Sequence, residues 1–292
     1  MFAAEFEYRK AGSIADAVRL LSENPGAKLL AGGHSLIPLM RFRLARPEVV
    51  IDIGGIDGLR GIRISDGSIN IGALATHAEI ANSADVQQAN GLLAEAAGGI
   101  GDPAVRNRGT IGGNLAHADP ASDWATVLTA LGATVSLQGP SGSRTIAVGD
   151  FVEDAFATAL AEDELITTVS VPVLAANQRA EYAKMAHPAS FYAVVGGAVV
   201  VTMDGDRCTA ASVAVGGLTP RPVKAAAVEQ ALSGTTLTMD SIADATSRLS
   251  EDLSAAGVDI IGDVYASADF RSQVAPVEVK HALLHAIGLA HH

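Results

Sequence analysis

Cysteine is nearly absent from this sequence, since Cys208 is the only one among 292 residues. An intrachain disulfide is therefore excluded. An iron–sulfur cluster of the ordinary kind is excluded as well, because such clusters take four cysteine thiolates. Cys208 follows the turn-like segment 203–207, so we expect a structural residue beside a hairpin turn rather than a nucleophile. If the chain takes part in iron–sulfur chemistry, the clusters must be held by a partner.

Positive charge and long apolar runs are also scarce. The chain has 20 Lys and Arg against 32 Asp and Glu, a formal net charge of −12, which argues against nucleic acid or an anionic membrane as a partner. The apolar stretch 194–201 is too short to span a membrane and contains Gly196 and Gly197. Residues 1–8 lack a basic region followed by an apolar run, so we predict no signal peptide and a cytoplasmic protein.

What is present is a large apolar fraction, 49% of the residues, which at this length can form the cores of two domains. Apolar periodicity, capping residues such as Ser13 and Thr76, and turn signals such as Asp66-Gly67 predict the elements. The first fifty residues have the pattern of a small α/β unit, and the rest up to about residue 173 mixes hairpins with helices. Predicted helices lie at 13–23, 36–44, 92–100 and 124–131, and predicted strands at 28–31, 49–53, 62–64, 68–72, 134–137, 144–148 and 164–172.

A second domain is predicted beyond a boundary at 174–178. There, strands at 193–202 and 209–217 precede helices at 225–232, 242–253 and 272–287, the order typical of an α+β domain. His281 and His285 lie one turn apart on the last helix, and because no third ligand is apparent we interpret them as part of a solvated helix face. His291 and His292 form a terminal tail.

The segment 101–123 is rich in glycine, proline, asparagine and aspartate, a composition typical of a long loop, and long loops in compact domains are usually functional. Gly112 and Gly113 can adopt backbone conformations closed to other residues, so that successive N–H groups point into one concavity and bind an anion. Thr110 and Asn114 flank the pair and can hydrogen-bond a phosphate or sugar. The alternative is a tight loop without a ligand.

A second glycine-rich loop follows the predicted strand 28–31. Gly32 and Gly33 precede His34 and Ser35, and an apolar helical pattern begins directly after them. This order presents backbone amides to a phosphate, and two such loops indicate a ligand with two phosphates. Neither loop matches the dinucleotide fingerprint or the phosphate loop of nucleoside triphosphatases. A Rossmann domain and a P-loop nucleoside triphosphatase are therefore both disfavoured.

Together, the loops Ala31–Ser35 and Thr110–Asn114 resemble the two FAD-pyrophosphate loops of the flavin-binding medium subunit of molybdenum hydroxylases. This family includes the carbon monoxide dehydrogenase medium subunits and the xanthine dehydrogenase FAD-binding subunits. The resemblance covers essentially the whole chain, with further matches at 71–73, 76–77, 105–109 and 121–123. It implies an α+β protein in which a two-part FAD-binding domain of the vanillyl-alcohol-oxidase-like type (1–175, divided near residue 55) precedes a smaller α+β C-terminal domain (176–288).

The resemblance also implies roles for individual residues. Asp123 would bind the ribityl hydroxyls, Lys184 would lie near the flavin pyrimidine edge, and Tyr192 would cover one face of the ring. The residues assigned to FAD are Ala31, Gly32, Gly33, His34, Ser35, Thr110, Ile111, Gly112, Gly113, Asn114, Asp123, Ile166, Lys184 and Tyr192. No catalytic residue and no metal ligand is assigned.

Simpler interpretations stay open for several of these residues. Asp123 can serve as the N-cap of the helix that follows it, with or without a role at the cofactor, and Ile166 can be strand core. His34 and His77 are interpreted as orienting groups rather than bases. His117 can contact the cofactor or be a structural loop residue, and Arg106 and Arg108 can reach phosphate or brace the loop.

The resulting hypothesis is an electron-transfer subunit that carries FAD. It would accept electrons from the iron–sulfur clusters of a small subunit, in a complex whose large subunit holds the molybdenum cofactor, as a dimer of heterotrimers. Two alternatives are a self-contained FAD-dependent oxidase or dehydrogenase and a non-redox diphosphate-binding protein. The resemblance leaves open the substrate (CO, an aldehyde, a purine or another N-heterocycle) and the terminal acceptor (a quinone, NAD or oxygen).

Overall fold

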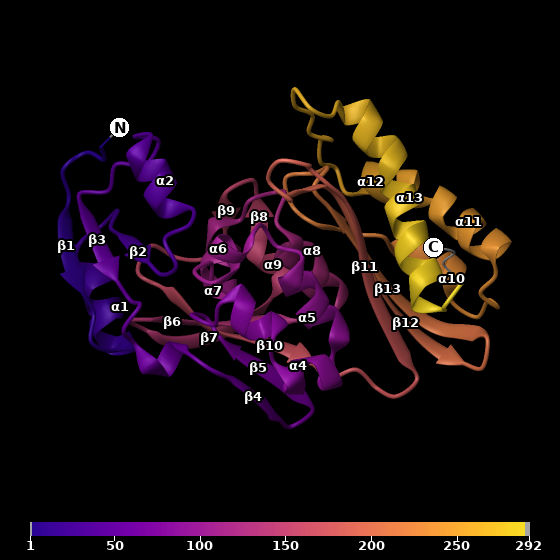
Figure 1. Ribbon diagram of the computed structural model, residues 1–292, viewed down its shortest axis with the longest axis horizontal. Helices are drawn as coiled ribbons and strands as arrows, with labels where there is room; N and C mark the ends of the chain where they lie inside the picture. The colour runs from indigo at the N-terminus through magenta and orange to yellow at the C-terminus, as the bar shows by residue number, and fades with distance from the viewer. Residues whose placement is uncertain (1, 290–292) are drawn as a thin grey trace.

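Three parts follow one another along the long axis of the molecule in the computed structural model, which describes residues 2–289 (Figure 1). The first is a three-stranded parallel sheet of order β1-β3-β2. Its first helix begins where the sequence predicts, because the Ser13 hydroxyl accepts a hydrogen bond from the amide of Asp16. The elements are β1 (Glu7–Lys10), α1 (Ile14–Glu23), β2 (Lys28–Leu30), α2 (Leu36–Arg41) and β3 (Val49–Asp52).

The middle part is built on a five-stranded antiparallel sheet of order β4-β5-β10-β6-β7. The last strand of this part in the sequence, β10, is the central strand of the sheet, so the chain returns to close it. The strands are β4 (Ile62–Ser65), β5 (Ser68–Gly72), β6 (Thr134–Gly139), β7 (Gly142–Ala147) and β10 (Leu165–Pro172), and a small hairpin is formed by β8 (Val152–Asp154) and β9 (Ala157–Thr158).

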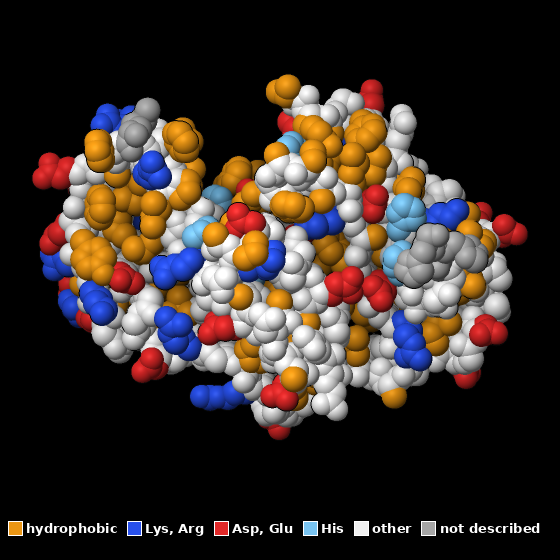
Figure 2. Space-filling model, viewed as in Figure 1, with side chains coloured by type: hydrophobic (Ala, Val, Ile, Leu, Met, Phe, Trp, Pro, Cys, Tyr) orange, Lys and Arg blue, Asp and Glu red, His pale blue; other side chains and the backbone are white. Residues whose placement is uncertain are grey.

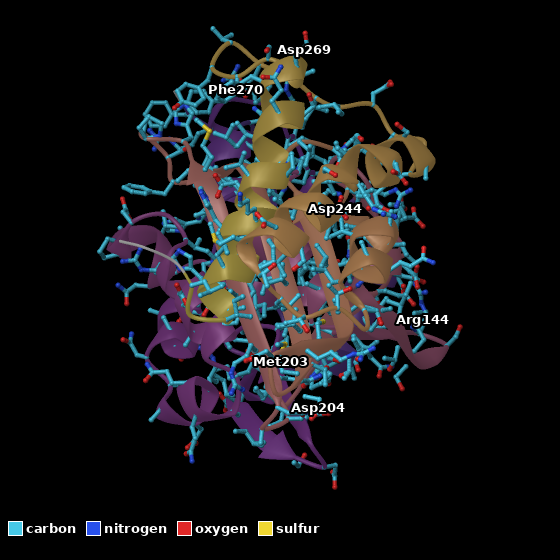
Figure 3. All side chains as sticks on the ribbon, turned by 90° about the vertical axis from the view of Figure 1, so that its right-hand side faces the viewer. Arg144, Met203, Asp204, Asp244, Asp269 and Phe270 are labelled. Carbon is cyan, nitrogen blue, oxygen red and sulfur yellow. The ribbon has the colours of Figure 1, made fainter. Side chains whose placement is uncertain are left out.

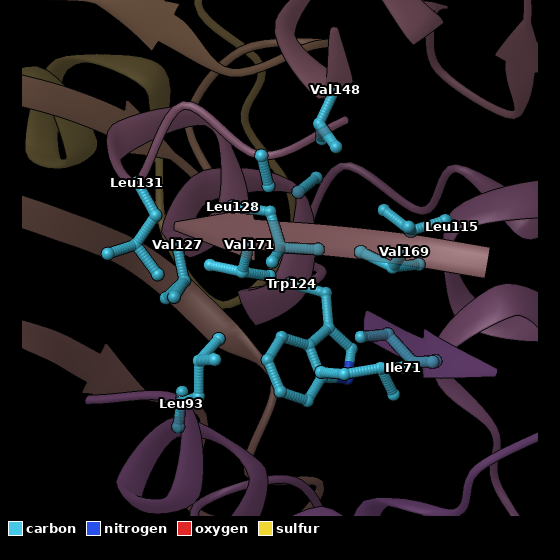
Figure 4. Packing of buried hydrophobic residues seen from close by; sticks show 14 of the residues in the cluster. Ile71, Leu93, Leu115, Trp124, Val127, Leu128, Leu131, Val148, Val169 and Val171 are labelled. Carbon is cyan, nitrogen blue, oxygen red and sulfur yellow. The ribbon is translucent and has the colours of Figure 1, made fainter. Parts of the chain in front are cut away.

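Helices cover this sheet and enclose the largest core of the molecule. Trp124 is fully buried there, among Ile71, Leu93, Val169 and Val171 (Figure 4). The helices are η1 (Asp57–Leu59), α3 (His77–Ala81), α4 (Ala84–Ala89), α5 (Gly91–Gly98), α6 (Pro103–Arg106), α7 (Ile111–His117), α8 (Asp123–Ala130) and α9 (Val148–Phe151).

The segment 101–123 is not one long loop, because it contains the short helices α6 and α7. Asp102 caps α6 by accepting from the amide of Val105, and the Thr110 hydroxyl caps α7 by accepting from the amide of Gly113. Gly112 lies inside the first turn of α7, and neither Gly112 nor Gly113 has a positive φ. The prediction that these two glycines adopt unusual backbone conformations was therefore wrong, and their assignment to the cofactor stays a prediction.

The third part is a four-stranded antiparallel sheet with helices on its outer side (Figure 3). Its second strand is buried on both faces along most of its length, which explains the continuous apolar run in the sequence. The predicted helix 242–253 is two helices that meet at Arg248. The elements are β11 (Gln178–Ala186), β12 (Ala193–Asp204), β13 (Arg207–Gly216), β14 (Val223–Lys224), α10 (Ala226–Leu232), α11 (Met239–Ser247), α12 (Leu249–Ala255) and α13 (Ala268–Ala286).

This third sheet is shared between two cores. Ala198 and Val200 belong to the core of the middle part, whereas Val199 and Val201 belong to the core beneath the C-terminal helices. Cys208 is fully buried in the latter core beside the β12–β13 turn, as expected for a structural residue. Among the described residues no helix is both long and apolar enough to cross a membrane. His291 and His292 lie outside the described residues.

Candidate functional site

The two glycine-rich segments are in direct contact. A Cβ atom on Gly32 would overlap the carbonyl oxygen of Arg108, and one on Gly113 would lie 3.7 Å from the Cβ of Ala31. An isolated antiparallel β-bridge between Thr76 and Thr110 holds the second segment in place. Glycine at position 32 is thus required by close approach of two chain segments.

A cleft of about 690 Å³ opens where these segments meet, between the small part and the middle part. It lies at the C-terminal ends of β2 and β3, the edge of a parallel sheet at which ligands usually bind. Its lining mixes polar and apolar residues and includes Gly32, Asp52, Arg60, Thr76, Arg108 and Thr110. Sequence reasoning missed Asp52 and Arg60, although the ends of the predicted parallel strands were a usable signal.

The two glycine segments differ in the backbone amides that they offer. Gly33 has φ +77, and the structure gives the N–H groups of Gly33, His34 and Ser35 no acceptor within residues 2–289. In contrast, the amides of Gly112 and Gly113 already donate to the Ala73 carbonyl and the Thr110 hydroxyl. A phosphate therefore fits the first segment through backbone N–H groups, whereas the amides of Gly112 and Gly113 are already engaged and a ligand there would meet side chains such as that of Asn114.

Asn114 supplies such a side chain. Its Oδ1 accepts a hydrogen bond from the Ser122 hydroxyl at 2.5 Å, which leaves its amide NH₂ group free to donate to a ligand. Ser122 directly precedes Asp123, so this contact lies between the second glycine segment and a second polar centre in the middle part.

Asp123 and Lys184 form that second centre, a buried ion pair with an Nζ–Oδ2 distance of 2.8 Å. The other carboxylate oxygen accepts from the Tyr182 hydroxyl at 2.7 Å. Burial raises the pKa of Asp123, and the neighbouring Lys184 ammonium opposes that rise. The N-cap of α8 is Ser122, so the interpretation of Asp123 as N-cap was wrong.

Lys184 has no proton left for a ligand in this arrangement. Besides Asp123, its ammonium donates to the carbonyl oxygens of Gly99 at 3.0 Å and Phe191 at 2.9 Å, which uses all three N–H groups. The lysine thereby ties the loop 187–192 to α5 and α8. Tyr192 ends this loop, and burial together with the charges of Asp119 and Asp123 raises its pKa.

Three further candidates make contacts within the chain. Ile166 is 5% exposed and packs in the middle core. His77 is buried and accepts a hydrogen bond from the Trp124 indole at 3.1 Å, and burial lowers its pKa to about 4, so it is neutral near pH 7. Arg106 braces the chain by donating to the carbonyls of Ile100 and Gly101.

Comparison with known proteins identifies the family of this chain. Residues 4–174 match the family model described as the FAD binding domain in molybdopterin dehydrogenase, and residues 180–286 match the CO dehydrogenase flavoprotein C-terminal domain. The chain belongs to the family of FAD-binding medium subunits of molybdenum hydroxylases.

Relatives of this medium subunit align over nearly their whole length. The 6-hydroxypseudooxynicotine dehydrogenase complex subunit alpha of Paenarthrobacter nicotinovorans is 37% identical over 97% of this chain and 94% of that protein. The carbon monoxide dehydrogenase medium chain of Hydrogenophaga pseudoflava is 36% identical over 97% of both. A solved structure of carbon monoxide dehydrogenase from the same organism has a TM-score of 0.93 over 100% of both chains, at 37% identity. Quinoline 2-oxidoreductase from Pseudomonas putida 86 has a TM-score of 0.92 over 100% of both chains, at 30% identity.

These comparisons confirm the α+β fold, the FAD-binding function and the subunit's place in a molybdenum hydroxylase complex. The medium chain of such a complex has small and large subunits as partners. Within residues 2–289 no three His, Cys, Asp or Glu side chains are placed to hold a metal ion. His281 is half-exposed on α13, with Nδ1 3.8 Å from a carboxylate oxygen of Glu278.

Proposed function

We propose that this subunit holds FAD in an extended form from the cleft to the Asp123–Lys184 pair. The observation that carries the proposal is the order of polar groups on neighbouring segments. The free amides of Gly33–Ser35 follow Ala31, which lies against Gly113, and Asn114 next to Gly113 is hydrogen-bonded to Ser122, which precedes Asp123 in the sequence. In this arrangement the pyrophosphate lies against Gly32–Ser35 and Asn114, and the ring lies beside Asp123 and Tyr192. Thr110, Ile111, Gly112 and Gly113 position Asn114, Ala31 lines the cleft, and Ile166 supports the site from the core.

Bound flavin supplies one-electron and two-electron transfer, and the protein binds, orients and tunes it. The chain's own residues contribute three things. The first loop neutralises a phosphate with oriented N–H groups, Asp123 accepts hydrogen bonds from hydroxyls, and Lys184 fixes the loop that ends at Tyr192. Lys184 acts through Asp123 and Phe191, so it is a positioning residue for the ring site.

We also propose that the complex is a dimer of heterotrimers, in which a small subunit with iron–sulfur clusters passes electrons from a molybdenum subunit to this chain. With a single cysteine this chain supplies no cluster of its own. We likewise propose that the two domains divide at 175/176 and that the protein is cytoplasmic.

Replacement of Asn114 by Asp tests the cofactor site. Asn114→Asp keeps the oxygen that accepts from Ser122, but it removes the NH₂ donor and adds a negative charge beside the proposed phosphates. We expect FAD to bind at least about tenfold more weakly, as expected when a hydrogen bond to a charged group is lost. The measurement is the visible absorption spectrum of the purified chain before and after incubation with FAD and desalting.

Two glycine variants complete the test. A Cβ on Gly113 would lie 2.7 Å from the Thr110 hydroxyl, so Gly113→Val should lose FAD. Nothing lies within 4 Å of a Cβ on Gly91, so Gly91→Ala should keep it. Circular dichroism establishes that the variants are folded. Full flavin retention by both Asn114→Asp and Gly113→Val would refute the proposed site.

A further inference from the structure

His77 is a buried titratable side chain that the proposed cofactor site does not use. It is 2% exposed, and burial lowers its pKa to about 4, so the ring is neutral near pH 7. The Trp124 indole donates from Nε1 to Nδ1 of His77 at 3.1 Å. Because an indole N–H group can only donate, Nδ1 carries no proton, and the neutral ring holds its single proton on Nε2.

The Nε2–H group of His77 has no partner in the described part of the chain. The structure gives it no acceptor within residues 2–289, although a buried donor without a hydrogen bond is costly. The side-chain atoms of that range that are both without a partner and sealed from solvent are Nδ2 and Oδ1 of Asn90. Nε2 of His77 is not among them, so an acceptor from outside the chain can reach it.

The ring edge that carries Nε2 lies at the junction of the two glycine segments. A Cβ on Gly109 would lie 2.8 Å from Nε2 of His77, and a Cβ on Gly32 would lie 3.2 Å from the Cα of Gly109. The amide of His77 donates to the Gly109 carbonyl at 3.0 Å, which fixes the ring against this segment. Since neither glycine carries a side chain, the ring edge comes close to the segment whose free amides belong to Gly33–Ser35.

The cleft between the small part and the middle part borders this junction. Its lining includes the residues on either side of His77 and of Gly109, namely Thr76, Ala78, Arg108 and Thr110. Besides burial, the charge of His34 in the first segment lowers the pKa of His77, which agrees with a position near that segment. In Figure 2 histidine side chains and Lys or Arg side chains lie where the two parts meet. An acceptor for Nε2–H would therefore approach from the cleft.

The charged groups of the cleft favour an anion as this acceptor. The guanidinium of Arg108 lines the cleft and has no acceptor within residues 2–289. The two carboxylates of the lining, in contrast, are engaged. Glu79 accepts from the amide and the hydroxyl of Thr76 at 2.6 and 2.9 Å, and Asp52 accepts from the amide of Gly54 at 2.7 Å. A phosphate oxygen would meet unpaired N–H donors here.

We propose that the Nε2–H group of His77 binds a phosphate oxygen of FAD at the junction of the two glycine segments. The inference rests on the proposed function, in which the pyrophosphate lies against Gly32–Ser35. Trp124 acts through His77, because its indole N–H fixes the tautomer that leaves Nε2–H free to donate. Trp124 is therefore a positioning residue for the phosphate site, and His77 is a binding residue.

Two substitutions separate the two nitrogens of the ring. His77→Asn places an amide oxygen near the former Nδ1, where it can accept from Trp124, but provides no donor in the place of Nε2. His77→Gln places an amide NH₂ group near the former Nε2 and leaves the Trp124 indole without its acceptor. His281→Asn, which removes a half-exposed histidine of α13, is the matched control.

Three measurements on the full chain give the answer. Isothermal titration calorimetry of the cofactor-free chain with FAD measures the affinity, and urea unfolding of the same samples measures the stability. Phosphorus NMR of each chain at saturating FAD reports on the two phosphates of the bound cofactor. A ring with a purely structural role would change the stability and leave the phosphorus resonances where they are.

We expect His77→Asn to bind FAD about tenfold more weakly, because a hydrogen bond to a charged group is lost, and to shift at least one phosphorus resonance. His77→Gln should keep most of the affinity and lose more stability than His77→Asn. The control His281→Asn should match the wild type in both the affinity and the spectrum.

The opposite pattern would overturn the inference. It would consist of wild-type affinity or unshifted phosphorus resonances in His77→Asn, or of a loss of affinity in the two His77 variants that follows their loss of stability. An ordered water would then be the partner of Nε2. Failure of the wild type to bind FAD would instead refute the proposed function.

Discussion

At the scale of single residues, burial decides what each polar side chain can do. His77 and Lys184 are both polar groups near the proposed site, and both are engaged in contacts within the chain. His77 is kept neutral by burial and accepts from Trp124, and Lys184 donates all its protons within the chain. The sequence predicts an orienting role for His77 and a place at the flavin for Lys184, and the contacts that engage both side chains depend on their surroundings.

The low pKa of His77 predicts a loss of stability in acid. Burial lowers this pKa from 6.5 to about 4, so the unfolded chain binds the proton more readily than the folded chain. The contribution is fully present above pH 6.5 and is lost as the pH falls toward 4, by about 3 kcal/mol. Urea unfolding between pH 7.5 and 4 measures it.

His77→Asn is the control for this prediction, because its Oδ1 can accept from Trp124 without titrating. We expect the variant to show a shallower decrease of the free energy of unfolding between pH 6.5 and 4. Equal slopes in the variant and the wild type would mean that His77 does not cause the acid sensitivity.

At the scale of elements, glycines on the third sheet determine how closely helices pack on it. A Cβ on Gly197 would lie 2.9 Å from the backbone nitrogen of Val279 on α13. On the other side, a Cβ on Gly216 would overlap the hydroxyl of Thr126 on α8. The sheet thus packs closely against α8 on one face and α13 on the other. A side chain at Gly197 or Gly216 would prevent this close packing.

Gly216→Ala is expected to destabilise the chain by about 1–3 kcal/mol, the usual cost of overpacking. The reason is that the new methyl group forces Thr126 and α8 away from the sheet. Chemical denaturation measures the loss. Adding Thr126→Ala removes the obstructing hydroxyl, so the double variant should regain part of the lost stability. If the changes in the free energy of unfolding caused by the two substitutions simply add, the proposed contact is contradicted.

At the scale of the whole molecule, the C-terminal part completes the core of the flavin-binding part. Ala198, Val200 and Ala214 of the third sheet belong to the same buried cluster as Trp124. Two family models match the chain on either side of residue 175, but the apolar contacts cross that position. A buried ion pair crosses it too, since Lys184 binds Asp123.

We therefore expect residues 1–175 alone to fold poorly, because removing the third sheet exposes the apolar face of α8. The full chain should unfold in a single transition. Circular dichroism and urea titration of both proteins measure this. A monomeric fragment with a cooperative transition of its own would show that the two parts are independent.

The amino-acid sequence by itself determined most elements and the ligand class. Capping residues such as Ser13 and Thr76, the Asp66-Gly67 turn and the apolar periodicity are local signals, and the helices and strands that they predict are present. The paired glycine segments indicated a diphosphate ligand and, through their family resemblance, FAD, which the comparisons confirm.

Only the tertiary structure decided how these pieces work together. The role of Gly112 as a close-packing residue in α7, with its amide already bonded, depends on Ala73, which is distant in the sequence. The use of every Lys184 proton depends on Gly99, Asp123 and Phe191. Local patterns contain no information on which remote groups satisfy a donor, so hydrogen-bond balance and exposure at the site follow from the folded chain alone.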